Sequence, residues 1–141
     1  MALIAIIGLA GCAYMGSALE FPEADGAALP DNEAGILDYA HVVGGITVDG
    51  IHASSRLSSG DYYGYSRLTP GDHTIVCKRH FSSGRSLDEK MILRVEAGHR
   101  YRLFIDSCYW CKSFRAVAWI ADENTGEIVA GHYPDWPSWW L

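Results

Sequence analysis

Apolar and polar residues alternate with a period of two along much of the chain. Two neighbouring segments show this most clearly, with Met91, Leu93 and Val95 in the first and Tyr101, Leu103 and Ile105 in the second. Alternation of this kind places apolar side chains on one face of a β-strand. No segment has an apolar stripe with the 3.6-residue period of a helix. The pattern therefore predicts an all-β fold.

Turn residues separate the segments that favour strands. The expected strand segments are 36–43, 44–54, 61–68, 74–81, 89–97, 100–108, 114–122 and 127–132. The turn signals between them include Asp49-Gly50, Pro70-Gly71, Gly98 and the sequence ENTG. This spacing predicts an antiparallel β-sandwich of about seven short strands, or an open barrel, over residues 36–132.

The start of the chain is an apolar run, residues 2–10, followed by Gly11 and Cys12. A helix that spans a bilayer takes about 20 residues, so this run is too short to cross one. It has the length of the hydrophobic region of a signal peptide. The sequence Leu9-Ala10-Gly11-Cys12 resembles the bacterial lipobox, although no Lys or Arg precedes Cys12.

That resemblance implies a signal peptide at residues 1–11, cleavage before Cys12, and acyl chains such as palmitate on Cys12. The chain would then be a lipoprotein of the bacterial cell envelope, with the membrane as a partner through its N-terminal lipid. Ala13 after the cysteine points to the outer membrane, with the domain facing the periplasm. The alternative is a buried N-terminal strand with an ordinary cysteine.

Two flanking segments lack a strand pattern. Residues 12–35 are rich in Ala, Gly, Pro and acidic residues, and we predict a lipid-anchored flexible tether there. Residues 133–141 form an aromatic C-terminal tail with Tyr133, Trp136, Trp139 and Trp140. These rings are expected to fold back over an open end of the sandwich, or to provide a surface for a partner protein, a glycan or the lipid interface.

The sequences VDG, LTPGDHTI, EAGHRYRL and DENTGEIV occur in that order between residues 45 and 131. In order and spacing they resemble small bacterial envelope lipoproteins with PEGA-like or transthyretin-like β-sandwich domains. The resemblance implies a fold and an envelope location, and it carries no catalytic residues. His73 and His99 lie just after turn glycines, so we expect them to form hydrogen bonds near those turns.

With Cys12 lipidated, Cys77, Cys108 and Cys111 are left, and thiols outside the cytoplasm tend to oxidise. A disulfide between Cys108 and Cys111 is the leading prediction, and Cys77 is the alternative partner for either. A thioredoxin-type redox site would need a helix after Cys108, whereas the following residues favour a strand. A metal site of the three cysteines with His80 or His132 is a further alternative.

The composition and the absence of certain motifs reduce the number of possible functions. A net charge of −6, with only 11 Lys and Arg, disfavours nucleic acid as a partner. No Ser-His-Asp set, no recognisable motif of paired carboxylates and no phosphate-binding glycine loop is present. We predict no metal site, because a structural zinc site usually has two close pairs of ligands and the sequence has only one. We therefore predict a non-enzymatic structural or protein-interaction module of the envelope that needs no cofactor. The alternatives are a thiol-redox or metal-handling protein that uses Cys108 and Cys111, and a glycan-binding module.

Overall fold

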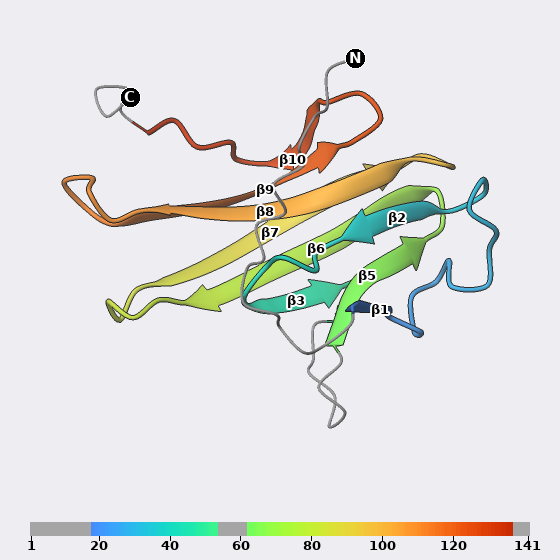
Figure 1. Ribbon diagram of the computed structural model, residues 1–141, viewed down its shortest axis with the longest axis horizontal. Helices are drawn as coiled ribbons and strands as arrows, with labels where there is room; N and C mark the ends of the chain where they lie inside the picture. The colour runs from blue at the N-terminus through green and yellow to red at the C-terminus, as the bar shows by residue number, and fades with distance from the viewer. Residues whose placement is uncertain (1–17, 54–61, 137–141) are drawn as a thin grey trace, which may run out of the picture.

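The computed structural model describes residues 18–53 and 62–136, which are all-β without a helix. Ten strands occur in these residues (Figure 1): β1 (Ala18–Glu20), β2 (Gly35–Asp38), β3 (Gly45–Val48), β4 (Ile51–His52), β5 (Tyr62–Leu68), β6 (Gly71–His80), β7 (Ser86–Val95), β8 (Arg100–Cys108), β9 (Arg115–Asp122) and β10 (Ile128–Gly131). Among the described residues there is no helix long and apolar enough to cross a membrane.

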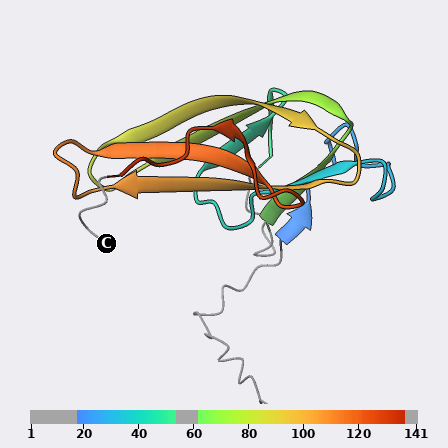
Figure 2. The same ribbon diagram turned by 90° about the horizontal axis from the view of Figure 1, so that it is seen from above.

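The strands form two sheets, which are not closed into a barrel. One has six strands in the order β1-β5-β2-β8-β9-β10, and the other has four in the order β4-β3-β6-β7. Seen from above, they form two layers (Figure 2). The apolar side chains that the two sheets turn toward each other share one core, which includes Leu37, Ile46, Ile75, Leu93, Leu103 and Ile120.

The predicted count of about seven strands is wrong, because the sequence does not separate the shortest ones. The segment 44–54 contains both β3 and β4, and β1 lies ahead of the predicted domain. The six-stranded sheet is also not purely antiparallel, since β1 pairs parallel with β5 and β2 pairs parallel with β8. Between β2 and β8 the chain passes through the other sheet, so a crossover rather than a hairpin brings them together.

The alternation seen in the sequence is confirmed in β7 and β8. Met91, Leu93 and Val95 are buried, whereas Ile92 between them is 54% exposed. Each glycine of the predicted turns named above has a positive φ, and Gly98 with φ 77° is one example. At such a φ a Cβ atom would be strained, which is why glycine is found there. The turns therefore lie where the sequence indicates them.

Residues 18–34, predicted to belong to the flexible tether, are packed on the domain instead. β1 pairs with β5, and Phe21 and Ala34 are buried, at 4% and 0% exposure. Arg67 of β5 binds this segment through ion pairs with Glu20 and Asp31. The folded part of the chain thus begins earlier than the strand pattern indicates, because contacts with β5 order a segment that has no strong pattern of its own.

The two sheets also meet at one edge, where β10 runs beside β7. A Cβ atom on Gly131 would lie 2.6 Å from Sδ of Met91. His132 follows β10, and its Nδ1 lies 2.5 Å from a carboxylate oxygen of Glu89 in β7. The last strand of one sheet is thereby tied to the edge strand of the other.

Candidate functional site

An aromatic pair lies on the outward side of β8 and β9. Along β8, Leu103 points into the core, and its neighbour Phe104 therefore points out. The antiparallel register sets Phe104 opposite Trp119 of β9. Their rings stack with centroids 5.2 Å apart and an interplanar angle of 15°. Phe104 is 36% exposed, so the pair is open to solvent.

The start of the C-terminal tail continues this aromatic surface. Tyr133, at 65% exposure, meets Trp119 edge to face with ring centroids 5.3 Å apart. The indole N–H of Trp136 donates a hydrogen bond to Asp106 of β8 at 2.9 Å. We call Phe104, Trp119, Tyr133 and Trp136 the aromatic face.

The described part of the tail, residues 133–136, thus lies along the outward side of β8 and β9. The register of β10 explains this, because Gly131 pairs with Trp119 and the N–H of His132 donates to the carbonyl of Ala118. The chain therefore leaves β10 alongside β9. Trp139 and Trp140 lie outside the described residues.

Charged side chains border the aromatic face. The guanidinium of Arg115 lies 5.1 Å from the ring centroid of Trp136 and forms an ion pair with Asp135 at 2.6 Å. On the other side, Arg102 forms an ion pair with Glu123 at 2.8 Å. Tryptophan, tyrosine and arginine are the residues that dominate binding at protein interfaces. The aromatic face and its border have that composition.

The cysteines are arranged as the leading prediction has them. The sulfurs of Cys108 and Cys111 are 2.08 Å apart, with Cα atoms at 5.5 Å. Cys77 faces the core from β6 and is free. Burial, with a smaller effect of the Glu89 carboxylate, raises the pKa of the Cys77 thiol to about 12. A thiolate, which metal binding and redox chemistry both require, is thus strongly disfavoured at Cys77.

The loop that contains the disulfide leads into a strand, β9, as the sequence indicates. A helix N-terminus, which activates the first cysteine of thioredoxin-type sites, is therefore not present at Cys108. The loop packs its Tyr109 and Phe114 rings on Phe81, which follows β6, with centroids 6.3 Å and 4.9 Å away. The disulfide thus closes a packed hairpin loop, which favours a structural role.

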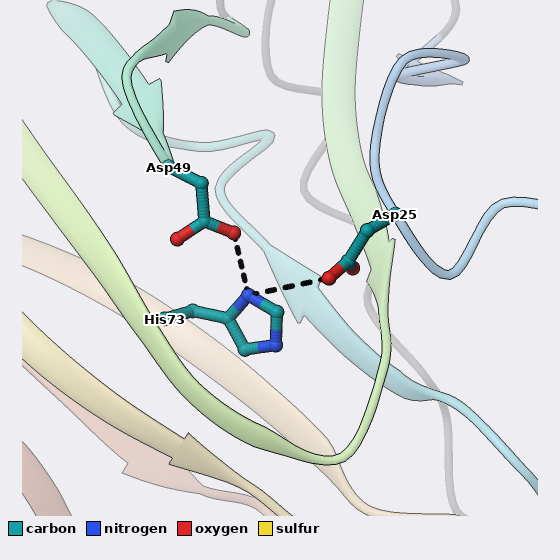
Figure 3. Close-up of side chains that lie close together, drawn as sticks. All are labelled: Asp25, Asp49 and His73. Carbon is teal, nitrogen blue, oxygen red and sulfur yellow. Dashed lines mark hydrogen bonds and ion pairs between the residues drawn. The ribbon is translucent and has the colours of Figure 1, made fainter.

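A cluster of polar side chains lies near the start of β6, at the end of the strand opposite to Phe81. His73 is buried, and its two ring nitrogens lie 2.6 Å from Oδ2 of Asp49 and 2.7 Å from the carbonyl oxygen of Thr69. Asp25 is also close, with its Oδ2 3.9 Å from Nδ1 of His73 (Figure 3). Burial alone would lower the pKa of His73, but the bonds to Asp49 and Thr69 outweigh it and hold that pKa above its ordinary value.

His99 is placed similarly at the start of the β8 strand. Its Nδ1 lies 2.7 Å from the buried carboxylate of Asp122, and its Nε2 lies 3.3 Å from Glu96. The expectation that His73 and His99 form hydrogen bonds near turns is confirmed. Their partners Asp25, Asp49 and Asp122 were not found from the sequence. Asp49 could have been noticed because it belongs to the predicted Asp-Gly turn. Asp25 lies in the segment predicted to be a tether, where nothing in the sequence indicated a contact with His73.

No known protein family matches the chain, and comparisons with curated proteins and with solved structures find no significant match either. Cys12 and the sequence that resembles a lipobox lie outside the described residues.

Proposed function

We propose that the chain is a non-enzymatic, lipid-anchored module of the bacterial cell envelope that binds a partner protein through the aromatic face. Its two sheets are best described as a β-sandwich of the PEGA-like or transthyretin-like kind. That resemblance rests on the order and spacing of the four sequences that contain Gly50, Gly71, Gly98 and Gly126, and the positive φ of these glycines places a turn in each of them. The lipobox sequence supports anchoring at Cys12 outside the cytoplasm.

The exposure of the aromatic face is the observation that carries the proposal. Four large rings lie together on one outward surface, and Tyr133 is 65% exposed and Phe104 36% exposed. A group of neighbouring exposed rings bordered by charged side chains is typical of interaction sites. The outward surface of a β-sheet also differs from the concave pockets in which enzymes bind small molecules. Protein binding therefore fits this surface better than catalysis does.

The test compares the tagged full chain with two variants expressed in the bacterial envelope. Phe104→Ala combined with Tyr133→Ala removes two exposed rings of the aromatic face. Ile92→Ala removes a side chain of similar exposure, 54%, from the outward side of β7 and serves as the control. We expect a protein captured by the wild type and by Ile92→Ala to fall at least about tenfold in the double variant. That protein, once purified, should show the same ranking in a binding titration.

Equal capture by all three proteins would contradict the proposal. Loss of binding to purified envelope glycan in the double variant, without a protein partner, would identify a glycan-binding module instead. Anchoring is tested separately by the intact mass of the membrane-purified protein. A diacyl or triacyl adduct on a chain that begins at Cys12 is expected, and an unmodified chain that retains Met1 would refute the envelope location.

A further inference from the structure

The cluster at the end of β6 brings three potential metal ligands together. Nδ1 of His73 and one carboxylate oxygen each from Asp25 and Asp49 all lie within 4.8 Å of one another. The three side chains come from separate parts of the chain, namely the loop after β1, the turn between β3 and β4, and β6. Figure 3 shows them pointing toward one common region.

The imidazole of His73 is oriented as in a metal-binding histidine. Its Nε2 lies 2.7 Å from the carbonyl oxygen of Thr69, which only accepts hydrogen bonds, so Nε2 carries a proton. Nδ1 is thereby the nitrogen turned toward the two carboxylates. Metal-ligating histidines generally donate their second ring N–H to a carbonyl or a carboxylate in this way. A cation bound here would replace the proton on Nδ1 that otherwise forms the hydrogen bond to Asp49.

Each carboxylate is held in place by hydrogen bonds from the backbone. Oδ1 of Asp49 accepts from the N–H of Thr74 at 2.9 Å, and Oδ1 of Asp25 accepts from the N–H of Thr69 at 3.0 Å. Oδ2 of Asp25 also accepts from the hydroxyl of Thr69 at 2.7 Å. Because these bonds fix both groups, the Oδ2 atoms face His73 without further ordering of the side chains.

The separations suit a small divalent cation. With metal–ligand distances of about 2.0 to 2.2 Å, two ligands of a tetrahedral zinc ion lie about 3.3 Å apart. Nδ1 of His73 is 2.6 Å from Oδ2 of Asp49 and 3.9 Å from Oδ2 of Asp25. Shifts of less than about 1 Å would bring both to the tetrahedral value. The two carboxylate oxygens lie within 4.8 Å of each other, so they would approach by at most about 1.5 Å. The Asp25 and Asp49 side chains are 47% and 39% exposed, so water has access to the open ligand positions.

We propose that Asp25, Asp49 and His73 form a binding site for a divalent transition-metal ion, with Zn²⁺ as the best match. One imidazole nitrogen favours zinc and its neighbours over calcium or magnesium, and two carboxylates neutralise the ion's charge. The ion joins the loop after β1, the turn after β3 and strand β6. This site lies apart from the aromatic face and does not depend on the function proposed for that face.

The test measures binding of Zn²⁺, and of Co²⁺ as a spectroscopic substitute, to the purified full chain. Calorimetry gives the stoichiometry, thermal unfolding gives the stabilisation, and the visible absorption of Co²⁺ reports its coordination. Asp25→Asn and Asp49→Asn are the informative variants, because their side chains are partly exposed and the fold tolerates the change better than at buried His73. Asp72→Asn is the control, since this exposed carboxylate of β6 pairs with Arg94 outside the cluster.

We expect one Zn²⁺ per chain, a rise in the melting temperature, and at least about tenfold weaker binding in Asp25→Asn and in Asp49→Asn. Asp72→Asn should bind as the wild type does. The proposal is overturned if the wild type binds no Zn²⁺ at millimolar concentration, or if Asp25→Asn and Asp49→Asn retain wild-type affinity. Binding of Ca²⁺ or Mg²⁺ in preference to Zn²⁺ and Co²⁺ would also overturn it.

Discussion

At the scale of single residues, the backbone conformation of the glycines and the ion pairs of the histidines lead to specific predictions about stability. Gly126 and Gly131 both have a positive φ, at 76° and 78°, but their surroundings differ. A Cβ atom on Gly126 would meet nothing within 4 Å, whereas one on Gly131 would lie 2.3 Å from the carbonyl oxygen of Ala118. A Gly→Ala substitution should therefore lower the stability of the fold by different amounts at the two positions.

We predict that Gly131→Ala destabilises the protein much more than Gly126→Ala. Gly126→Ala should lower the free energy of unfolding by about 1 to 2 kcal/mol, the cost of a Cβ atom in a left-handed conformation. Gly131→Ala should cost a further 1 to 3 kcal/mol, roughly, because its Cβ atom would also collide with backbone and with Met91. Urea unfolding of both variants measures the difference, and equal losses would contradict the collision.

We also predict that the contribution of His99 to stability is lost as the pH rises. The hydrogen bond to Asp122 is the main cause that raises the pKa of His99 above its ordinary value of 6.5. A pKa raised in the folded state means that the stabilisation is complete below pH 6.5 and disappears above the folded-state pKa. The difference in unfolding free energy between the wild type and His99→Gln should shrink from pH 6 to pH 9. A difference that does not change with pH would show that the imidazolium has no such role.

At the scale of elements, the hairpin of β8 and β9 joins the candidate site to the disulfide. Its strands hold the aromatic face on the outward side, and its loop contains the bridge between Cys108 and Cys111. The ten-residue strands β6 and β7 form the corresponding long hairpin of the other sheet. Contacts of Phe81 with the rings of Tyr109 and Phe114 join the two hairpin loops.

We expect the double variant Cys108→Ser, Cys111→Ser to keep its fold. A bridge that closes so short a loop contributes at most about 2 kcal/mol through the entropy of the unfolded chain. The register of β8 and β9 holds the hairpin in the absence of the bridge. Chemical unfolding and the circular dichroism spectrum test this. Complete unfolding of the double variant, or loss of a thiol-exchange activity in a folded one, would show that the disulfide does more than close the loop.

At the scale of the whole molecule, residues 18–34 complete the domain that the strand pattern places at residues 36–132. Phe21 is buried beside the edge of Tyr63, with ring centroids 5.4 Å apart. Asp25, a proposed metal ligand, lies in the same segment. The fold and the cluster of Asp25, Asp49 and His73 therefore both depend on residues that precede β2.

We predict that a chain starting at Ile36 is less stable than a chain starting at Ala18, which serves as the control. Removing Phe21 alone from its buried position should cost at least about 3 kcal/mol, and β1 is lost with it. Thermal and urea unfolding of the two truncated chains give the comparison. Equal stability would mean that residues 18–34 are a tether after all.

Most of the strands and turns follow from local patterns in the amino-acid sequence. Alternation in the segments of β7 and β8 identified their buried faces, because side chains of a strand point to opposite sides in turn. Turn glycines such as Gly98 and Gly126 were also identified, since only residues tolerant of a positive φ fit there. The pair Cys108 and Cys111 could also be recognised. Strand alternation, turn glycines and this cysteine pair all depend on residues that are near one another in the chain.

Contacts between distant residues could not be predicted from the sequence and are known from the three-dimensional fold. The fold placed β2 parallel to β8, set Tyr133 against Trp119, and brought Asp25 and Asp49 to His73. These pairs are separated by many residues, and nothing in the local pattern of either partner specifies the other. They follow from how the two sheets pack around one core, because that packing fixes the register and the edge at which each loop ends. Both candidate sites of this protein arise at that level.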